Sequence, residues 1–232
     1  MQIFPRKLLE SFEGSVFLVQ LTRFSKLLLS RIIDVVAEYC GPTQNGFLTG
    51  RSTADVVACV RRLMDSSVEF HSGLFLKLVD FSKAFDKVNR SAIRIILLNC
   101  GIDFRLVHMI YDLLSDTTVA VKVRRRKSRQ VPVKMGVRQG CPISPCLFIV
   151  VLAFLVHSCA SKFPSLFHWE YADDLTLIAE SKPLVEDAFA YIASAGEPLG
   201  LIVNHNKTEN FEVLQGLRTS KGKKKVRDKW IS

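Results

Sequence analysis

Three aspartates in two separated segments are the residues of this sequence best suited to metal chemistry. Asp173 and Asp174 are adjacent in Tyr171-Ala172-Asp173-Asp174, just before an apolar stretch, and Asp80 ends the alternating segment Leu74 to Val79. Neighbouring carboxylates in apolar surroundings repel each other and are costly to desolvate, so a bound cation would stabilise them. Hard oxygen ligands suit Mg²⁺, and a pair of such ions can stabilise both oxygens of a phosphoryl displacement. An isolated Asp-Asp pair is more often a solvated turn, so the chemistry needs support from elsewhere in the chain.

The loop between these acidic segments has the composition of a segment that a substrate approaches closely. It reads Gly136-Val137-Arg138-Gln139-Gly140-Cys141-Pro142-Ile143-Ser144-Pro145. Glycine permits close backbone approach, whereas proline is excluded from the interior of a sheet. The apolar run that follows, Leu147 to Val156, spans about ten residues, fewer than the roughly twenty that a membrane helix needs. We therefore predict a buried core helix and no membrane partner.

Together these segments resemble the reverse transcriptase domain of non-LTR (LINE-type) retrotransposons. Four motifs occur in the family's order: motif A over residues 78–86, motif B over 136–145, motif C over 171–175 and motif D over 200–209. The segment Gln44 to Thr53 is also similar to the family's sequence before motif A. Several ordered segments are far more specific than the tetrapeptide of motif C alone.

The resemblance implies an α+β fold: a polymerase palm, which is an antiparallel sheet covered by helices, with partial fingers and without the thumb that follows motif D in the family. It implies an RNA-directed DNA polymerase that joins nucleotides to a primer 3′-hydroxyl by a two-metal mechanism. Mg²⁺ is the implied cofactor, with Mn²⁺ as a substitute. The implied partners are an RNA template, a DNA primer and deoxynucleoside triphosphates. The sequence does not determine the oligomeric state.

The resemblance also assigns catalytic roles. Asp80 and Asp173 would be the principal metal ligands and Asp174 a further member of the acidic cluster. One ion would lower the pKa of the primer hydroxyl, and the other would hold the triphosphate and the departing pyrophosphate. Lys207 in motif D corresponds to a lysine that protonates the pyrophosphate; without the motif it would be an exposed charge. Asp86 lies beyond the strand end, so we favour a structural or capping role for it.

Phe85, Gln139 and Gly140 are the predicted nucleotide-binding residues. Phe85 corresponds to the family position beneath the incoming sugar, where a ring would collide with a ribose 2′-hydroxyl; the alternative is an ordinary core phenylalanine. Gln139 and Gly140 would lie along the template and the nucleotide, because glutamine supplies both donors and acceptors and glycine leaves room for the ligand.

The charge of the chain favours a polyanionic partner, because 32 Lys+Arg against 22 Asp+Glu give a net charge of +10. Arg51 could contact template or triphosphate, with surface solvation as the alternative, and Arg138 could pair with a phosphate or with a nearby acid. The basic run over residues 218–229 suits RNA binding, nuclear import or a solvated tail. The predicted nucleic-acid-binding residues are Arg51, Arg138, Lys223, Lys224 and Lys225.

Length and composition bound the domain organisation. A chain of 232 residues with 48% hydrophobic and 23% charged residues can bury a sizeable core. We predict partial fingers over residues 1–43, a palm with finger elements over 44–214 and a flexible basic tail over 215–232. The six cysteines form no Cys-x-x-Cys pair, and no secretory signal is evident. We therefore expect reduced, mostly buried thiols in an intracellular protein, nuclear or cytoplasmic and not secreted.

Hydrophobic periodicity and turn residues predict the elements that position these side chains. We expect strands over 74–79, 201–203 and 209–213, a motif C hairpin, and a second hairpin from 119–123 and 131–133 around a basic turn at 124–129. Helices are expected near 24–39, 53–68, 91–99, 104–114 and 183–195, covering one face of the sheet.

One departure from the family keeps a second function open. Family members carry an Arg-Pro-Ile-Ser-like segment ahead of the first helix, and its arginine grips the triphosphate. Here Val16-Phe17-Leu18-Val19 occupies that place. The alternative is therefore a truncated, catalytically silent remnant that binds nucleic acid or serves as an interaction module.

Overall fold

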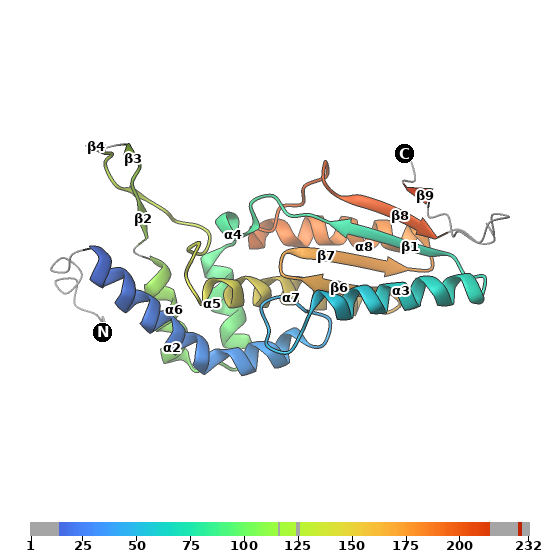
Figure 1. Cartoon of the computed structure of the whole chain (residues 1–232), viewed down its shortest axis with the longest axis horizontal. Coiled ribbons are helices and arrows are strands. Elements are labelled where there is room, and N and C mark those ends of the chain that lie inside the picture. The colour runs from blue at the N-terminus through green and yellow to red at the C-terminus, as the bar shows by residue number, and fades with distance from the viewer. Residues whose placement is uncertain (1–13, 116, 124–125, 214–226, 229–232) are drawn as a thin grey trace.

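A five-stranded antiparallel sheet with the spatial order β6-β7-β1-β8-β9 lies at the centre of the fold (Figure 1). The computed structural model describes residues 14–115, 117–123, 126–213 and 227–228. Motif A leaves the central strand β1, and motif C is the β6–β7 hairpin paired beside it, so the sheet brings both acidic segments to the same end. The strands are β1 (Leu74–Val79), β6 (Phe167–Tyr171), β7 (Asp174–Ala179), β8 (Glu209–Val213) and β9 (Arg227–Asp228).

One face of the sheet packs against α7 (Ser144–Lys162) and α8 (Lys182–Gly196), which continues into a 3-10 turn, η1 (Glu197–Leu199). α7 is apolar on all sides, which is typical of a helix surrounded by protein. By length and composition alone it could cross a membrane, but most of its side chains are buried inside the fold. The predicted buried core helix is confirmed, while its length of 19 residues exceeds the predicted run.

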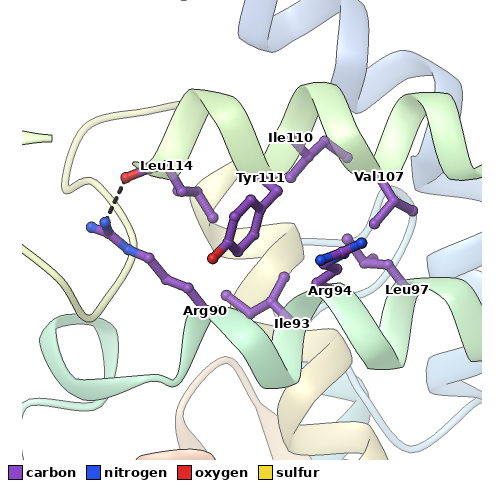
Figure 2. A pocket seen from close by; sticks show the side chains of 8 residues that line it. All are labelled: Arg90, Ile93, Arg94, Leu97, Val107, Ile110, Tyr111 and Leu114. Carbon is purple, nitrogen blue, oxygen red and sulfur yellow. Dashed lines mark hydrogen bonds between the residues drawn. The ribbon is translucent and has the colours of Figure 1, made fainter. Parts of the chain in front are cut away.

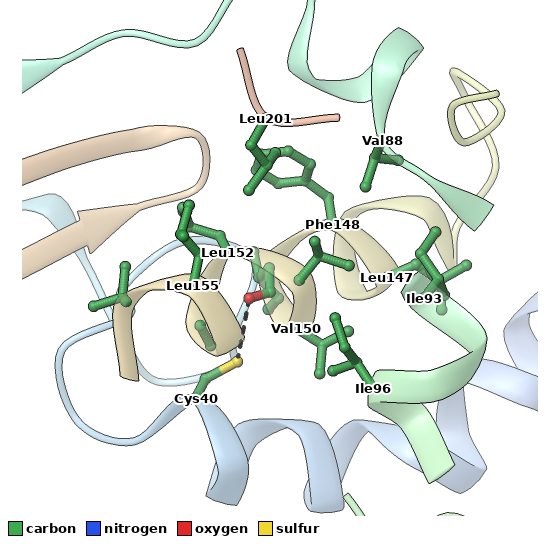
Figure 3. Packing of buried hydrophobic residues seen from close by; sticks show 14 of the residues in the cluster. Cys40, Val88, Ile93, Ile96, Leu147, Phe148, Val150, Leu152, Leu155 and Leu201 are labelled. Atoms are coloured by element: carbon green, nitrogen blue, oxygen red, sulfur yellow. Dashed lines mark hydrogen bonds between the residues drawn. The ribbon is translucent and has the colours of Figure 1, made fainter. Parts of the chain in front are cut away.

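Three further helices pack around α7. They are α2 (Gly14–Cys40), α5 (Arg90–Asn99) and α6 (Phe104–Ser115), with α2 and α5 contacting α7 and α6 contacting α5. Figure 3 shows Ile93 and Ile96 of α5 lying against Leu147 and Val150 of α7, and the thiol of Cys40 directed at the carbonyl of Ile149. α2 begins at Gly14 and not near Phe24, so the predicted start of this helix was wrong.

The opposite face of the sheet is partly covered by α3 (Thr53–Glu69). A small cluster of buried residues on β1, β7 and β8 packs there against α3 side chains, among them Val60, Leu63, Met64 and Val68. The prediction that helices cover only one face was therefore wrong. α3 starts at Thr53, as predicted. The carboxylate of Asp55 stabilises this start by accepting hydrogen bonds from the backbone and hydroxyl of Ser52, at 3.2 and 3.1 Å.

The predicted hairpin between motifs A and B is confirmed and projects from the body of the fold (Figure 1). It consists of β2 (Thr118–Val119) paired with β5 (Val131–Pro132), and β3 (Lys122–Val123) paired with β4 (Arg126–Lys127). Part of the predicted basic turn is thus strand. Two local differences occur near motif A: its last residues form a short helix, α4 (Ala84–Lys87), and the predicted strand over 201–203 forms only a single bridge, Phe81 to Val203.

Candidate active site

Strand register brings the three aspartates together. β1 and β7 are antiparallel with Val79 opposite Leu175, so continuing the ladder by one residue places Asp80 opposite Asp174. Directly opposed residues of an antiparallel pair have β-carbons about 4.5–5.5 Å apart. Tyr171 pairs with Asp174 across the β6–β7 hairpin, which leaves Ala172 and Asp173 as its two turn residues.

The electrostatics agree with this register. Burial raises the pKa of Asp174, and the charges of Asp173 and Asp80 raise it further. The acids therefore lie close enough to repel one another, which a divalent cation would relieve. Within the described ranges, no group of three or more His, Cys, Asp or Glu side chains is arranged as a metal site. The structure thus brings the acids to one sheet end without closing their oxygens around a common point.

The motif C turn has a backbone conformation that alanine rarely adopts. Ala172 has a φ of +59°, in the left-handed region that costs a non-glycine residue roughly 1–2 kcal/mol. The segment before motif A packs directly on this turn: a β-carbon at Gly46 would lie 2.2 Å from the backbone nitrogen of Ala172. Only glycine fits there. Its neighbour Gln44 accepts hydrogen bonds through Oε1 from the amides of Gly46 and Ala172, at 2.8 and 3.1 Å.

Motif D is joined to motif A through the backbone. The amide of Ser82 donates to the carbonyl of Ile202 at 2.7 Å, and the amide of Asn204 donates to the carbonyl of Asp80 at 2.8 Å. Lys207 follows in the turn that Asn204 begins, with its side chain exposed. The turn that carries the predicted catalytic lysine is therefore hydrogen-bonded to the backbone of Asp80 itself.

Motif B packs against the end of motif A. The amide of Gly136 donates to the carbonyl of Val88 at 2.9 Å, and the amide of Val137 donates to the carbonyl of Phe85 at 2.8 Å. Gly136 has a φ of +76°, and a β-carbon there would lie 2.5 Å from the carbonyl oxygen of Asp86. This glycine is required by both backbone angle and space.

The sequence matches the family described as reverse transcriptase (RNA-dependent DNA polymerase) over residues 15–227. The chain belongs to this family. A Pol polyprotein of a type-1 retrotransposable element from Popillia japonica is 33% identical over 58% of the chain, and one from Nasonia vitripennis is 24% identical over 81%. The chain spans 20% and 19% of the length of these two relatives. Both are Pol polyproteins of R2 retrotransposable elements, which together with the family match supports a reverse transcriptase domain of the non-LTR retrotransposon class.

Solved structures show the same fold. A telomerase from Candida albicans superposes with a TM-score of 0.63 at 16% identity, covering 93% of this chain and 38% of the telomerase. A telomerase from Candida tropicalis gives a TM-score of 0.64 at 14% identity, covering 84% of this chain and 33% of that one. The predicted α+β polymerase palm is confirmed.

In this reverse transcriptase domain, Phe85 packs against other aromatic rings and belongs to motif A, as Asp80 does. It is partly buried, stacks on Phe148 with ring centroids 4.6 Å apart, and meets the exposed ring of Phe47 edge-on at 6.3 Å. The two roles considered for Phe85 are thus compatible. One side of the ring packs on Phe148, and the ring is partly exposed. Selection of deoxynucleotides by this ring stays a prediction.

Gln139 and Gly140 lie on the exposed surface of the motif B loop. Gln139 donates from Nε2 to the carboxylate of Asp86 at 2.9 Å, which gives Asp86 a structural contact, as predicted, and fixes the amide of Gln139 in this state. Gly140 has a φ of +80°, and no atom lies within 4 Å of a β-carbon placed there. The space beside Gly140 is therefore open to a ligand.

The arginines predicted to bind nucleic acid have partners within the chain. Arg51 donates to the carbonyls of Gly41 and Gln44, the latter at 2.6 Å, and so braces the loop that packs on motif C. Arg138 donates to the hydroxyl of Thr117 at 3.0 Å. Their contacts with nucleic acid stay predictions. The predicted tail residues Lys223, Lys224 and Lys225 lie outside the described residues.

Sequence reasoning missed two buried groups that organise the site. Arg90 is 6% exposed and donates to the carbonyls of Gly136, Leu114, Val133 and Met135, at 2.8, 2.5, 2.7 and 3.2 Å. Figure 2 shows its guanidinium reaching Leu114, at the end of α6, where carbonyls are unpaired within the helix. Burial lowers the pKa of Arg90, and Arg138 lowers it further. Nothing local in the sequence distinguishes Arg90 from a solvated arginine.

The second missed group is Glu170, which lies on β6 one residue before motif C and is 1% exposed. Its carboxylate accepts from Thr43 at 3.3 Å and from Gln44 at 3.4 Å, and His168 lies 3.5 Å away. Burial raises its pKa to about 7, partly offset by the Thr43 hydrogen bond. A carboxylate in a strand with aromatic residues, directly before the motif C turn, was the available signal.

Proposed function

We propose that this chain catalyses RNA-directed DNA synthesis, in which the 3′-hydroxyl of a DNA primer attacks the α-phosphorus of a deoxynucleoside triphosphate and displaces pyrophosphate. The observation that carries the proposal is the register of β1 and β7, with Asp80 opposite Asp174 and Asp173 in the adjoining turn. Family membership over residues 15–227 supports it.

Asp80, Asp173 and Asp174 are the residues that would hold Mg²⁺ in a two-metal reaction. Their oxygens are the hard ligands that this ion prefers, and the raised pKa of Asp174 reflects a crowding of negative charge that a cation relieves. When bound, the metal supplies positive charge that lowers the pKa of the primer hydroxyl and neutralises the departing pyrophosphate.

Two other residues act on the nucleotide in this proposal. Lys207 is exposed on a turn whose first residue is bonded to the carbonyl of Asp80, so its ammonium can approach a leaving group beside the acids and give it a proton. Phe85 presents a ring held by Phe148, and a rigid ring excludes a ribose 2′-hydroxyl better than a mobile one.

Nucleic acid is the proposed macromolecular partner. The net charge of +10 favours a polyanion, and the similar telomerase from Candida albicans was solved with a fragment of telomeric RNA. Arg51, Arg138 and the tail lysines 223–225 are the proposed phosphate contacts, and an intracellular location fits these partners.

A catalytically silent nucleic-acid-binding module is the second candidate. One observation favours it: in the described part of the chain, no three acidic, histidine or cysteine side chains are arranged around a common metal position. Under this alternative, the chain would bind a primer-template without extending it.

Primer extension tests the proposal. The full chain is incubated with an RNA template, an annealed DNA primer, labelled deoxynucleotide and Mg²⁺ or Mn²⁺. Extension by wild type, lost in Asp80→Asn and Asp173→Asn and retained in Asp187→Asn, supports the enzyme; Asp187 is an exposed acid on α8 and serves as the matched control. Binding without extension under both metals would establish the silent module instead.

A further inference from the structure

The motif C turn needs an external support to keep its shape. Ala172 occupies the left-handed region with a φ of +59°, and the residue is buried. A strained non-glycine residue persists only where the surrounding structure over-determines its conformation. The hairpin is also at the sheet edge, because among the described residues β6 pairs with β7 as its only neighbouring strand. The support must therefore come from outside the sheet.

The segment over residues 43–46 lies against this edge. Gln44 forms a parallel bridge with Glu170, the amide of Asn45 donates to the carbonyl of Glu170 at 2.8 Å, and the amide of Glu170 donates to the carbonyl of Thr43 at 3.0 Å. These backbone bonds fix Gln44 beside β6. They do not reach the turn itself, which is contacted by the side chain of Gln44.

Gln44 holds the turn through one oxygen atom. Its side chain is fully buried, and Oε1 accepts from the amide of Ala172 at 3.1 Å and from the amide of Gly46 at 2.8 Å. The bond to Ala172 acts at the strained residue, immediately before Asp173. Any displacement of Oε1 would release the amide that precedes the acidic pair.

Glu170 determines which end of the amide faces the turn. The nitrogen of Gln44, Nε2, donates to Glu170 Oε2 at 3.4 Å, and Thr43 donates to the other carboxylate oxygen. In the flipped orientation, the NH₂ group would face two backbone donors and the oxygen would face a carboxylate. Both contacts would be unfavourable, so the orientation follows from the partners.

We infer that Gln44 is a positioning residue for catalysis: oriented by Glu170, its side-chain oxygen holds the Ala172 amide and thereby fixes Asp173 and Asp174 relative to Asp80. The catalytic part of this inference rests on the proposed function, whereas the contact itself does not. The contact of Gln44 with motif C is made to the backbone of Ala172, so the residue acts through the turn.

Amide hydrogen exchange in the full chain tests the contact directly. In Gln44→Leu, which keeps a similar volume, exchange at Ala172 should rise about tenfold, the equivalent of one net hydrogen bond of roughly 1.4 kcal/mol. Amides within β7, such as Leu177, should keep their protection. Gln44→Asn, which is too short to reach both amides, replaces the leucine variant if that chain does not fold. Unchanged exchange at Ala172 would overturn the inference.

Kinetics separate positioning from a purely structural role. For Gln44→Leu, kcat should fall about 10- to 100-fold, the size of effect that a displacement of about 1 Å produces, while KM for the deoxynucleotide changes little. Loss of protection at Ala172 with an unchanged kcat would also overturn the inference. Gln20→Leu, at an exposed glutamine of α2, is the matched control for this variant, and Gln20→Glu is the control for Gln44→Glu.

Exchanging the side chains of Gln44 and Glu170 is the most specific test. Gln44→Glu alone places two carboxyl groups against each other and should lower kcat, whereas the double variant Gln44→Glu with Glu170→Gln restores an acid facing an amide and should recover kcat to within about threefold of wild type. No recovery in a folded double variant would refute the orienting role of Glu170. If wild type extends no primer, the proposed function fails, and the exchange result still decides the contact.

Discussion

The two faces of the central sheet differ in how completely they are filled. On the α7/α8 face, Val79, Leu175 and Leu177 are each at most 2% exposed within one large core. On the α3 face, Leu78 is 40% exposed and lines an open groove of about 610 Å³ with Leu76, Thr176 and residues of α3. The α7/α8 face of the sheet is thus fully packed, whereas the α3 face is only partly covered.

The aspartates belong to the open face. Side chains alternate along a strand, so Asp80 shares the side of Leu76 and Leu78, and Asp174 shares the side of Thr176. Rigidity and access are therefore supplied by opposite faces of the same strands: the packed face fixes the backbone, and the open face leaves the carboxylates accessible.

The largest expected effect is on activity at the open face. Asp80→Asn and Asp173→Asn should each lower primer extension by at least about a thousandfold, roughly 4 kcal/mol of transition-state stabilisation, because each removes a charge from the acidic cluster. The thermal midpoint should not fall, since repulsion near Asp174 is also reduced. Extension rates and thermal melts on the same samples check this. Activity surviving either change would show that these acids are not the metal ligands.

The next effect contrasts the two faces directly. Leu177→Ala should lower the free energy of unfolding by about 3 kcal/mol, because it leaves a cavity in a closed core, whereas Leu78→Ala should cost under about 1 kcal/mol. Chemical denaturation of both variants measures the difference. Equal losses would mean that the groove beside Leu78 is closed in solution.

Glu170 should make stability depend on pH. Its carboxyl has a folded pKa near 7 against an ordinary value of 4.5, so folding favours the protonated form. This contribution is fully present below about pH 4.5 and is lost as the pH rises through 7, a change of about 3 kcal/mol. Glu170→Gln should therefore gain stability relative to wild type between pH 5 and 8.

Titration of the neighbouring His168 would not produce the same pH dependence of stability. The pKa of His168 is lowered to about 4, first by burial and then by His157, so its contribution is lost as the pH falls, in the opposite direction to that of Glu170. Thermal melts from pH 5 to 8, with the exposed Glu180→Gln as control, isolate Glu170. A constant difference between variant and wild type across this range would contradict the raised pKa.

A smaller effect is expected in sugar selection. Phe85→Ala should reduce discrimination against ribonucleotides by about tenfold, or roughly 1–2 kcal/mol, because it opens the space that the ring occupies. The ratio of kcat/KM for matched deoxy- and ribonucleotides measures this. If the ratio is unchanged, Phe85 serves the core through Phe148 and nothing more.

The smallest effect is expected at the turn itself. Ala172→Gly removes the strain of a positive φ but makes the unfolded chain more flexible, so stability should change by no more than about 0.5 kcal/mol. Ala172→Val should be clearly destabilising, because a β-branched residue tolerates this region poorly. A large gain from glycine would mean that the turn stores more strain than its contacts offset.

Local signals in the sequence were enough to predict most of the elements of this fold and to single out its candidate acids. Alternation in Leu74 to Val79, the cap at Ser52 and the apolar run after Pro145 are local signals, and the structure has a strand, a helix start and a core helix there. The motif spacing identified the acids and the family, because residue types at fixed positions carry that information without coordinates. The start of α2 and the extent of α7 were misjudged, since helix ends depend on packing more than on propensity.

The surroundings of the acids, by contrast, could be known only from the packing of the folded chain. Glu170 offered a local signal but its partner did not: a glutamine in a loop is ordinary in sequence, and a separation of 126 positions hides the contact between them. The same holds for Arg90, whose acceptors lie 24 to 46 positions away. The physical reason is that a buried polar group is defined by its partners, and those partners are assembled by strand pairing and helix packing, which no local pattern records.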